Sequence, residues 1–213
     1  KLQSMEGDSK PILQESMVQE SAKSYHLKRG KATYEEFLEL TSDDEVNRYE
    51  FIDGKIYLLT SPTITHQFVV TKMLIIFGEW FQESKCTPFT APNDIRLKRG
   101  HHEEPNVVQP DLMVICDLDD HLDDNDYYTG VPSLTVEVLS ESTQSKDLVT
   151  KLDIYMTSGV KEYWIVSPFN KEVTLYRFED GEVTNTLTYK HRETAQSFLF
   201  EGLSVKLEQI FRS

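Results

Sequence analysis

Two short apolar runs, each carrying one carboxylate, constrain most strongly how this chain can fold. Residues 107–116 contain Asp111 and residues 134–140 contain Glu137, and both runs are rich in β-branched residues and bounded by polar ones. These features predict buried strands. A buried carboxylate needs a hydrogen bond, an opposite charge or a metal ion, so Asp111 and Glu137 are the residues to explain.

The composition limits the classes of protein to which the chain can belong. A length of 213 residues suits one domain with a full core, which we place at 32–213 behind a flexible or loosely docked extension at 1–31. No apolar run is long enough to span a membrane, so we expect a cytoplasmic protein without membrane association. The net charge of −14 disfavours long-range attraction to nucleic acid. A nucleic-acid role therefore needs a local basic face or a metal ion.

The two cysteines, Cys86 and Cys116, lack the spacing of a zinc or redox motif. We interpret them as buried free thiols.

The first half of the domain has clear start and turn signals. Thr33 and Glu36 form a capping box that opens a short helix ending near Thr41. Asp53-Gly54 between two aromatic and β-branched runs predicts a hairpin over 48–59. Ser61 as N-cap with Pro62 at the first helical position predicts a long helix to about Ser84.

The second half combines strands with one further helix. We expect a helix from about 144 to 158 that ends at Gly159. The predicted strands that follow residue 88 are 89–90, 95–97, 107–116, 134–140, 162–166, 173–178, 183–189 and 198–200. This order predicts an α/β (mixed α+β) fold, a central mixed β-sheet flanked by helices with extra antiparallel hairpins. A βαβ crossover around the helix is expected.

Spacing brings several polar side chains towards the two carboxylates. Side chains alternate along a strand, so Gln109 shares a face with Asp111. Asp147, Lys151 and Tyr155 recur every four residues on one face of the predicted helix. Two carboxylates on neighbouring strands can share Mg²⁺, and a nearby lysine can stabilise charge on a phosphate. The residues alone also allow Asp111 simply to begin a strand and Glu137 to pair structurally with Lys151 or Arg96.

Several runs together resemble the restriction-endonuclease-like family known as domain of unknown function 820, a member of the PD-(D/E)xK nuclease superfamily. The resemblance covers about residues 33–180 in consistent order. Its motifs are Tyr49 to Gly54, Ser61-Pro62 with His66, Ala91 to Asp94, Gln109 to Leu112, Val136 to Ser140 and Gly159 to Val166.

The resemblance implies roles for individual residues. The first acidic residue of the superfamily maps to Glu50, the central Pro-Asp to Pro110-Asp111, and the second carboxylate to Glu137. The superfamily usually has lysine two residues later, where this chain has Leu139, and Lys151 on the next helix matches the displaced position. Ser140-Glu141-Ser142 departs from the usual Ser-Pro-Ser, which affects entry into the helix.

Supporting residues have alternative interpretations. His66 could act as a general base or substrate contact, or be an ordinary residue near a helix start. Gln109 could orient a water or a phosphate, and Glu50 could instead pair with Arg48 or Lys55. The basic cluster Arg96, Lys98, Arg99, His101 and His102 is either a phosphate-contacting loop or a solvated turn.

The resulting leading hypothesis is a Mg²⁺- or Mn²⁺-dependent nuclease acting on DNA, or on RNA. Asp111, Glu137 and Glu50 would bind the metal, with Lys151, Gln109 and His66 completing the catalytic set. The alternative is a non-catalytic nucleic-acid or protein-binding module on the same fold. Aromatic residues of the late strands could also pair across a two-fold axis in a homodimer; they are Tyr163, Trp164, Tyr176 and Phe178.

Overall fold

The computed structural model describes residues 31–44, 46–100, 102–140 and 146–212. The predicted extension at 1–31 lies outside these ranges except for Lys31. The helices are α2 (Tyr34–Ser42), α3 (Ile64–Phe81), α4 (Lys146–Ser158) and α5 (Leu207–Ile210), with a 3-10 turn η1 (Leu118–Asp120). No helix within the described ranges is long and apolar enough to cross a membrane.

Three sheets contain the described strands. The larger sheet has the order β10-β9-β8-β7-β6-β3, and only β7 and β8 run parallel. The smaller sheet has the order β2-β1-β5-β4, and β11 pairs with β12. Their bounds are β1 (Arg48–Ile52), β2 (Lys55–Leu59), β3 (Thr87–Thr90), β4 (Ile95–Leu97), β5 (Asn106–Val108), β6 (Leu112–Ile115), β7 (Leu134–Val138), β8 (Glu162–Ser167), β9 (Glu172–Glu179), β10 (Glu182–Lys190), β11 (Thr194–Gln196) and β12 (Ser204–Lys206).

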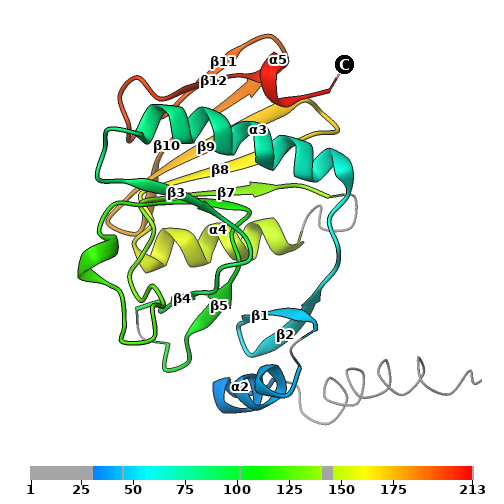
Figure 1. The fold of residues 1–213 in the computed structure, drawn as a ribbon, viewed down its shortest axis with the longest axis vertical. Coiled ribbons are helices and arrows are strands. Elements are labelled where there is room, and N and C mark those ends of the chain that lie inside the picture. The colour runs from blue at the N-terminus through cyan, green and yellow to red at the C-terminus, as the bar shows by residue number, and fades with distance from the viewer. Residues whose placement is uncertain (1–30, 45, 101, 141–145, 213) are drawn as a thin grey trace, which may run out of the picture.

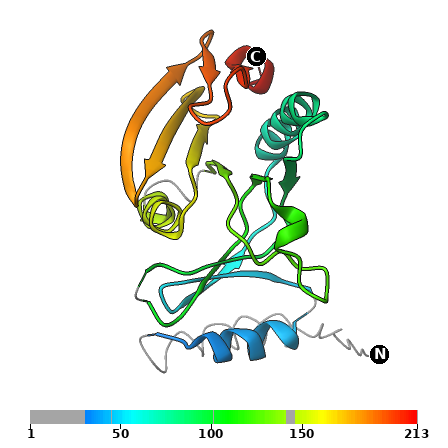
Figure 2. The ribbon, with the colours of Figure 1, turned by 90° about the vertical axis from the view of Figure 1, so that its left-hand side faces the viewer.

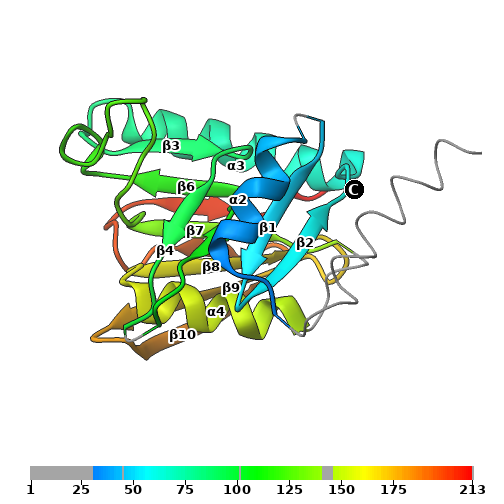
Figure 3. The ribbon, with the colours of Figure 1, turned by 90° about the horizontal axis from the view of Figure 1, so that it is seen from below.

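Helices cover both faces of the larger sheet. Trp164 and Val166 of β8 pack with α3 and α5, whereas Tyr163, which precedes them and points to the other face, packs with Tyr155 of α4. Figures 1 and 2 show α3 on one side of this sheet and α4 on the other. The smaller sheet lies beside α4, and α2 crosses the outer side of β1 (Figure 3). The mixed α/β fold predicted from the sequence is therefore confirmed.

Several local signals give the predicted structure. The Thr33–Glu36 capping box opens α2, and Asp53 and Gly54 take the positive φ angles of the β1–β2 turn. The β7–α4–β8 unit is the expected parallel crossover, and Gly159 follows α4 with φ of 99°.

Other predicted boundaries are wrong. The helix expected to begin at Pro62 begins at Ile64, because the Thr63 hydroxyl accepts the His66 backbone N–H and makes Thr63 the N-cap. Residues 198–200 form no strand, because the Leu199 backbone N–H donates to the buried Glu162 carboxylate instead of a neighbouring strand.

The strand predicted over 107–116 is two strands in two different sheets, β5 and β6. Pro110 has no N–H for a strand ladder, and the Gln109 N–H donates to Glu50 Oε1. The chain therefore crosses from the smaller to the larger sheet at Gln109-Pro110-Asp111.

The expectation of free thiols is also wrong, since Cys86 and Cys116 form a disulfide. The antiparallel register pairs Thr87 with Ile115, which places the two cysteines opposite each other just beyond that pair.

The late-strand aromatics are more buried than expected. Tyr163 and Trp164 are fully buried, and Phe178 is nearly so. These three side chains fill the core and offer no surface for pairing between subunits, whereas Tyr176 is half-buried.

Candidate active site

Asp111 lies where the chain passes between the two sheets. Its Oδ2 accepts the Val138 backbone N–H at 2.8 Å and lies 3.1 Å from His66 Nε2. These two contacts fix the carboxylate at the end of β7 beside the first turn of α3. Asp111 therefore does more than precede a strand, because its carboxylate has two defined partners.

Glu137 of β7 faces α4 and is buried. Its Oε1 accepts hydrogen bonds from Lys151 Nζ at 2.9 Å and from the Tyr155 hydroxyl at 2.6 Å. Burial raises the pKa of Glu137 to about 7 even though Lys151 lowers it, and Asp111 and Glu50 add to the rise. Burial is thus the main cause of the raised pKa, and the repulsion among three neighbouring carboxylates adds to it.

Glu50 joins the group from the smaller sheet. Its Oε1 accepts from the Gln109 backbone N–H and from Lys151 Nζ, both at 2.9 Å. It pairs with neither Arg48 nor Lys55. Glu50 therefore contacts both α4 and the segment at Gln109 where the chain crosses between the two sheets.

Lys151 bridges Glu50 and Glu137, so the lysine on the helix does approach the carboxylates. Burial alone would lower the pKa of Lys151, but the two carboxylates outweigh it and raise the pKa above its usual value. The side chain is therefore a fixed cation. The side chain of Asp147, predicted on the same helix face, lies outside what the structure describes.

His66 is positioned by the helix start and by Asp111. Burial would lower its pKa, but the hydrogen bond and charge of Asp111 raise it above the ordinary value. Its Nδ1 is buried and has no hydrogen-bond partner among the described residues. The imidazole therefore holds Asp111 and retains one ring nitrogen for a further contact.

Gln109 lies close to the site but does not share a strand face with Asp111. Its Nε2 donates to Asp94 Oδ1 at 2.8 Å, and burial raises the pKa of Asp94. The role of Asp94 was not visible in the sequence, because no helix or strand period links positions 94 and 109.

The basic cluster predicted from the sequence has mostly structural contacts. Arg99 forms ion pairs with Asp53 and Asp153, and Arg96 lies 3.9 Å from Asp123. His101 lies outside the described residues. The solvated or structural interpretation fits this cluster better than a phosphate-contacting loop.

The carboxylates form the inner part of a cleft of about 800 Å³. The β1–β2 hairpin, the first turn of α3, the end of β7 and the turn after β8 surround it. Three further lining residues, Arg48, Tyr57 and Phe169, were not expected in the site, because their separation along the chain conceals that they meet.

The donor set fits a hard divalent cation. Across the described ranges no three Asp, Glu, His or Cys side chains are arranged to hold a metal as they stand, since Lys151 lies between Glu50 and Glu137. However, Mg²⁺ usually takes only one or two carboxylates and keeps several waters. Asp111 and Glu137 supply these, and three carboxylates beside one ammonium leave an excess of negative charge for a cation.

Comparisons with known proteins agree with this architecture. The chain is 25% identical over 183 residues to the uncharacterized protein slr1290 of Synechocystis, covering 85% of this chain and 92% of that protein. A crystal structure from Anabaena variabilis, described as "a putative nuclease belonging to DUF820", shares the fold with a TM-score of 0.66. Its sequence identity is 20%, and the match covers 84% of this chain and 97% of that one.

The sequence model of a family described as "Uma2: Putative restriction endonuclease" matches residues 34–208. This range includes the larger and the smaller sheet, α3, α4 and each of the carboxylates described above. The chain belongs to the Uma2 family of restriction-endonuclease-like, nuclease-related proteins.

Proposed function

We propose that the chain is a divalent-metal-dependent nuclease that hydrolyses phosphodiester bonds in DNA, with RNA as the alternative substrate. The observation that supports this most strongly is the meeting of Glu50, Asp111, Glu137 and Lys151 in one cleft from four separate segments. Membership of a restriction-endonuclease-like family supports the same reaction class.

Asp111 and Glu137, with Glu50 beside them, would hold Mg²⁺ or Mn²⁺. When bound, such a cation lowers the pKa of a coordinated water and polarises a phosphoryl oxygen.

The remaining residues act on the substrate and on the carboxylates. Lys151 supplies a fixed ammonium that can donate to a phosphate oxygen and stabilise the charge that develops there. His66 and the Val138 N–H hold the Asp111 carboxylate, and Tyr155 holds that of Glu137. Gln109 lines the cleft and can contact water or a phosphate.

The test is cleavage of single-stranded DNA, duplex DNA and RNA by the full chain with Mg²⁺, Mn²⁺ or EDTA. We expect cleavage with either metal, none with EDTA, and a loss of at least about 100-fold in Asp111→Asn, as for removal of a preorganised charged group. Asp180→Asn in the β9–β10 turn is the control, because Asn tolerates its positive φ. Equal cleavage by Asp111→Asn and the unaltered chain would exclude this function.

A second candidate is a non-catalytic binding module on the same fold. The Lys151 bridge between Glu50 and Glu137 favours it, because an ammonium can neutralise these carboxylates without a metal. Calorimetric titration separates the two functions. Heat of Mg²⁺ or Mn²⁺ binding that disappears in Asp111→Asn supports the nuclease, and its absence at millimolar metal supports the binding module.

A further inference from the structure

The size of the cleft limits which part of a nucleic acid can enter it. Its volume of about 800 Å³ lies in the range of roughly 300–1,000 Å³ that small-ligand pockets occupy. A short stretch of unpaired nucleotides fits such a volume, whereas an intact duplex would have to lie across its mouth. The carboxylates lie inside the cleft, so the strand to be cut must reach inwards.

Phe169 offers an aromatic surface in this cleft. It lies in the turn between β8 and β9, is 46% exposed and makes no ring contact with another described residue. Asn170 holds the turn, with its backbone N–H donating to Ser167 Oγ at 3.3 Å and its Nδ2 to Glu172 Oε1 at 3.2 Å. An exposed ring on a fixed turn can stack on a nucleobase of any sequence.

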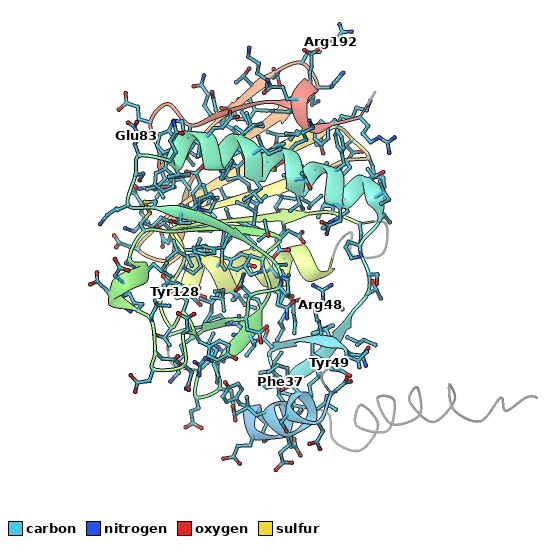
Figure 4. All side chains as sticks on the ribbon, viewed as in Figure 1. Phe37, Arg48, Tyr49, Glu83, Tyr128 and Arg192 are labelled. Carbon is cyan, nitrogen blue, oxygen red and sulfur yellow. A yellow bond between two sulfur atoms is a disulfide. The ribbon has the colours of Figure 1, made fainter. Side chains whose placement is uncertain are left out.

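Arg48 supplies a cation in the same cleft. It is the first residue of β1, and no ion pair joins it to another residue in the described ranges. Figure 4 shows Arg48 beside the β1–β2 hairpin, far from Arg192 at the opposite end of the molecule. Lys151 already gives two of its three N–H donors to carboxylates. Arg48 can therefore offer its guanidinium to a second phosphate, away from the carboxylates.

The distribution of charge argues against binding of an extended duplex. Tight duplex binding depends on many phosphate contacts from lysine and arginine, but this chain has a net charge of −14. Among the residues that the structure describes, the lysine and arginine side chains lining the cleft are Arg48 and Lys151. Base stacking must therefore provide binding energy that phosphate contacts do not.

We propose that the cleft binds an unpaired segment of nucleic acid, with one base stacked on Phe169 and one phosphate on Arg48, and selects single strands over duplex. This inference rests on the proposed nuclease function, for which it names the substrate class. Phe169 and Arg48 are substrate-binding residues in this account and are separate from the carboxylates.

The test is fluorescence anisotropy of the full chain with a short labelled single strand and with a blunt duplex of the same sequence. Ca²⁺ replaces Mg²⁺, and a gel afterwards checks that the strands are intact. We expect the single strand to bind at least about tenfold more tightly. Phe169→Ala should weaken it about tenfold, the equivalent of one base stack, while Phe169→Trp should retain binding.

Salt dependence tests Arg48 separately. Arg48→Ala should reduce the slope of log affinity against log salt concentration by about 0.7, the value for one phosphate contact on a single strand. The matched controls are Tyr127→Ala, an exposed aromatic outside the cleft lining, and Arg192→Ala, whose side chain is 81% exposed. Neither should change affinity or slope.

Equal affinity for single strand and duplex would overturn the proposal, as would a Phe169→Ala protein that binds like Tyr127→Ala. These outcomes are independent of turnover. Binding that depends on Phe169 without any cleavage in Mg²⁺ would refute the nuclease and keep the binding mode. Cleavage of duplex in preference to single strands would support the nuclease and refute the binding mode.

Discussion

Lys151 is the residue on which the charge balance of the site depends. It is the shared donor to Glu50 and Glu137, and the side chains of all three residues are about one-tenth exposed or less. Replacing it with methionine keeps the length of the side chain and leaves two buried carboxylates without their ammonium. Breaking a buried pair in this way typically costs about 3–5 kcal/mol, so Lys151→Met should lower the free energy of unfolding by about 3 kcal/mol at pH 8.

The loss should depend on pH in a defined direction. Glu137 already has a pKa raised to about 7, and removing Lys151 raises it further. A carboxyl group with a raised folded-state pKa stabilises the fold below its unfolded pKa and loses that contribution as pH rises through the folded value. Urea unfolding should therefore show a smaller defect at pH 5 than at pH 8. Lys161→Met, an exposed lysine, is the control, and an identical defect at both pH values would contradict the explanation.

For individual residues of the candidate site, the sequence predicted which side chains come together better than it predicted the contacts between them. The resemblance identified Glu50, Asp111, Glu137 and Lys151, and the structure brings all four together. It could not show that one ammonium bridges two carboxylates, because that depends on how the smaller sheet is placed against α4. The contact between Asp111 and the Val138 N–H was equally hidden, since a backbone donor carries no sequence signal.

Arg99 connects the elements that carry the site. It follows β4 and pairs with Asp53 in the β1–β2 turn and with Asp153 of α4, and its side chain is 11% exposed. The smaller sheet, which carries Glu50, is thereby tied to the helix that carries Lys151. Both aspartates are partly exposed and can be solvated, so Arg99→Met should cost about 2 kcal/mol, less than a fully buried pair.

The effect of Arg99→Met should be greatest in the hairpin. Hydrogen exchange of β1 and β2 amides should quicken, while that of β7 and β8 in the larger sheet changes little. Lys98→Met is the matched control, because the neighbouring Lys98 is exposed and has no ion pair among the described residues. Uniform acceleration across both sheets would show that Arg99 stabilises the whole fold instead of this connection.

Element boundaries were predictable where short-range chemistry sets them. The capping box, the Asp-Gly turn and Gly159 act over a few residues, so α2, the β1–β2 hairpin and the end of α4 were found. The division of residues 107–116 into β5 and β6 was not, because a strand and a crossing between sheets share the same apolar composition. The Gln109 N–H leaves the ladder only because Glu50 lies within reach.

The whole molecule contains one covalent link that sequence patterns did not show. Cys86 and Cys116 are 30 residues apart, and the loop between them carries β4 and β5 of the smaller sheet as well as β6 of the larger one. Strand register, not spacing, brings them together. In the chain-entropy model, closing a loop of this length lowers the conformational entropy of the unfolded chain and thereby stabilises the folded protein by about 3–4 kcal/mol.

Reduction should therefore lower the stability of the whole molecule. With a phosphine reductant, the midpoint of urea unfolding should fall by an amount equivalent to roughly 3 kcal/mol, and thiol titration should change from no free cysteines to two. The variant with Cys86→Ser and Cys116→Ser should match the reduced protein and show no response to reductant. Because both sheets share the closed loop, the β1–β2 hairpin and the β7–β8 pair should lose protection together. Two free thiols in the untreated protein, or an unfolding midpoint that reductant does not move, would instead support the free cysteines inferred from the sequence.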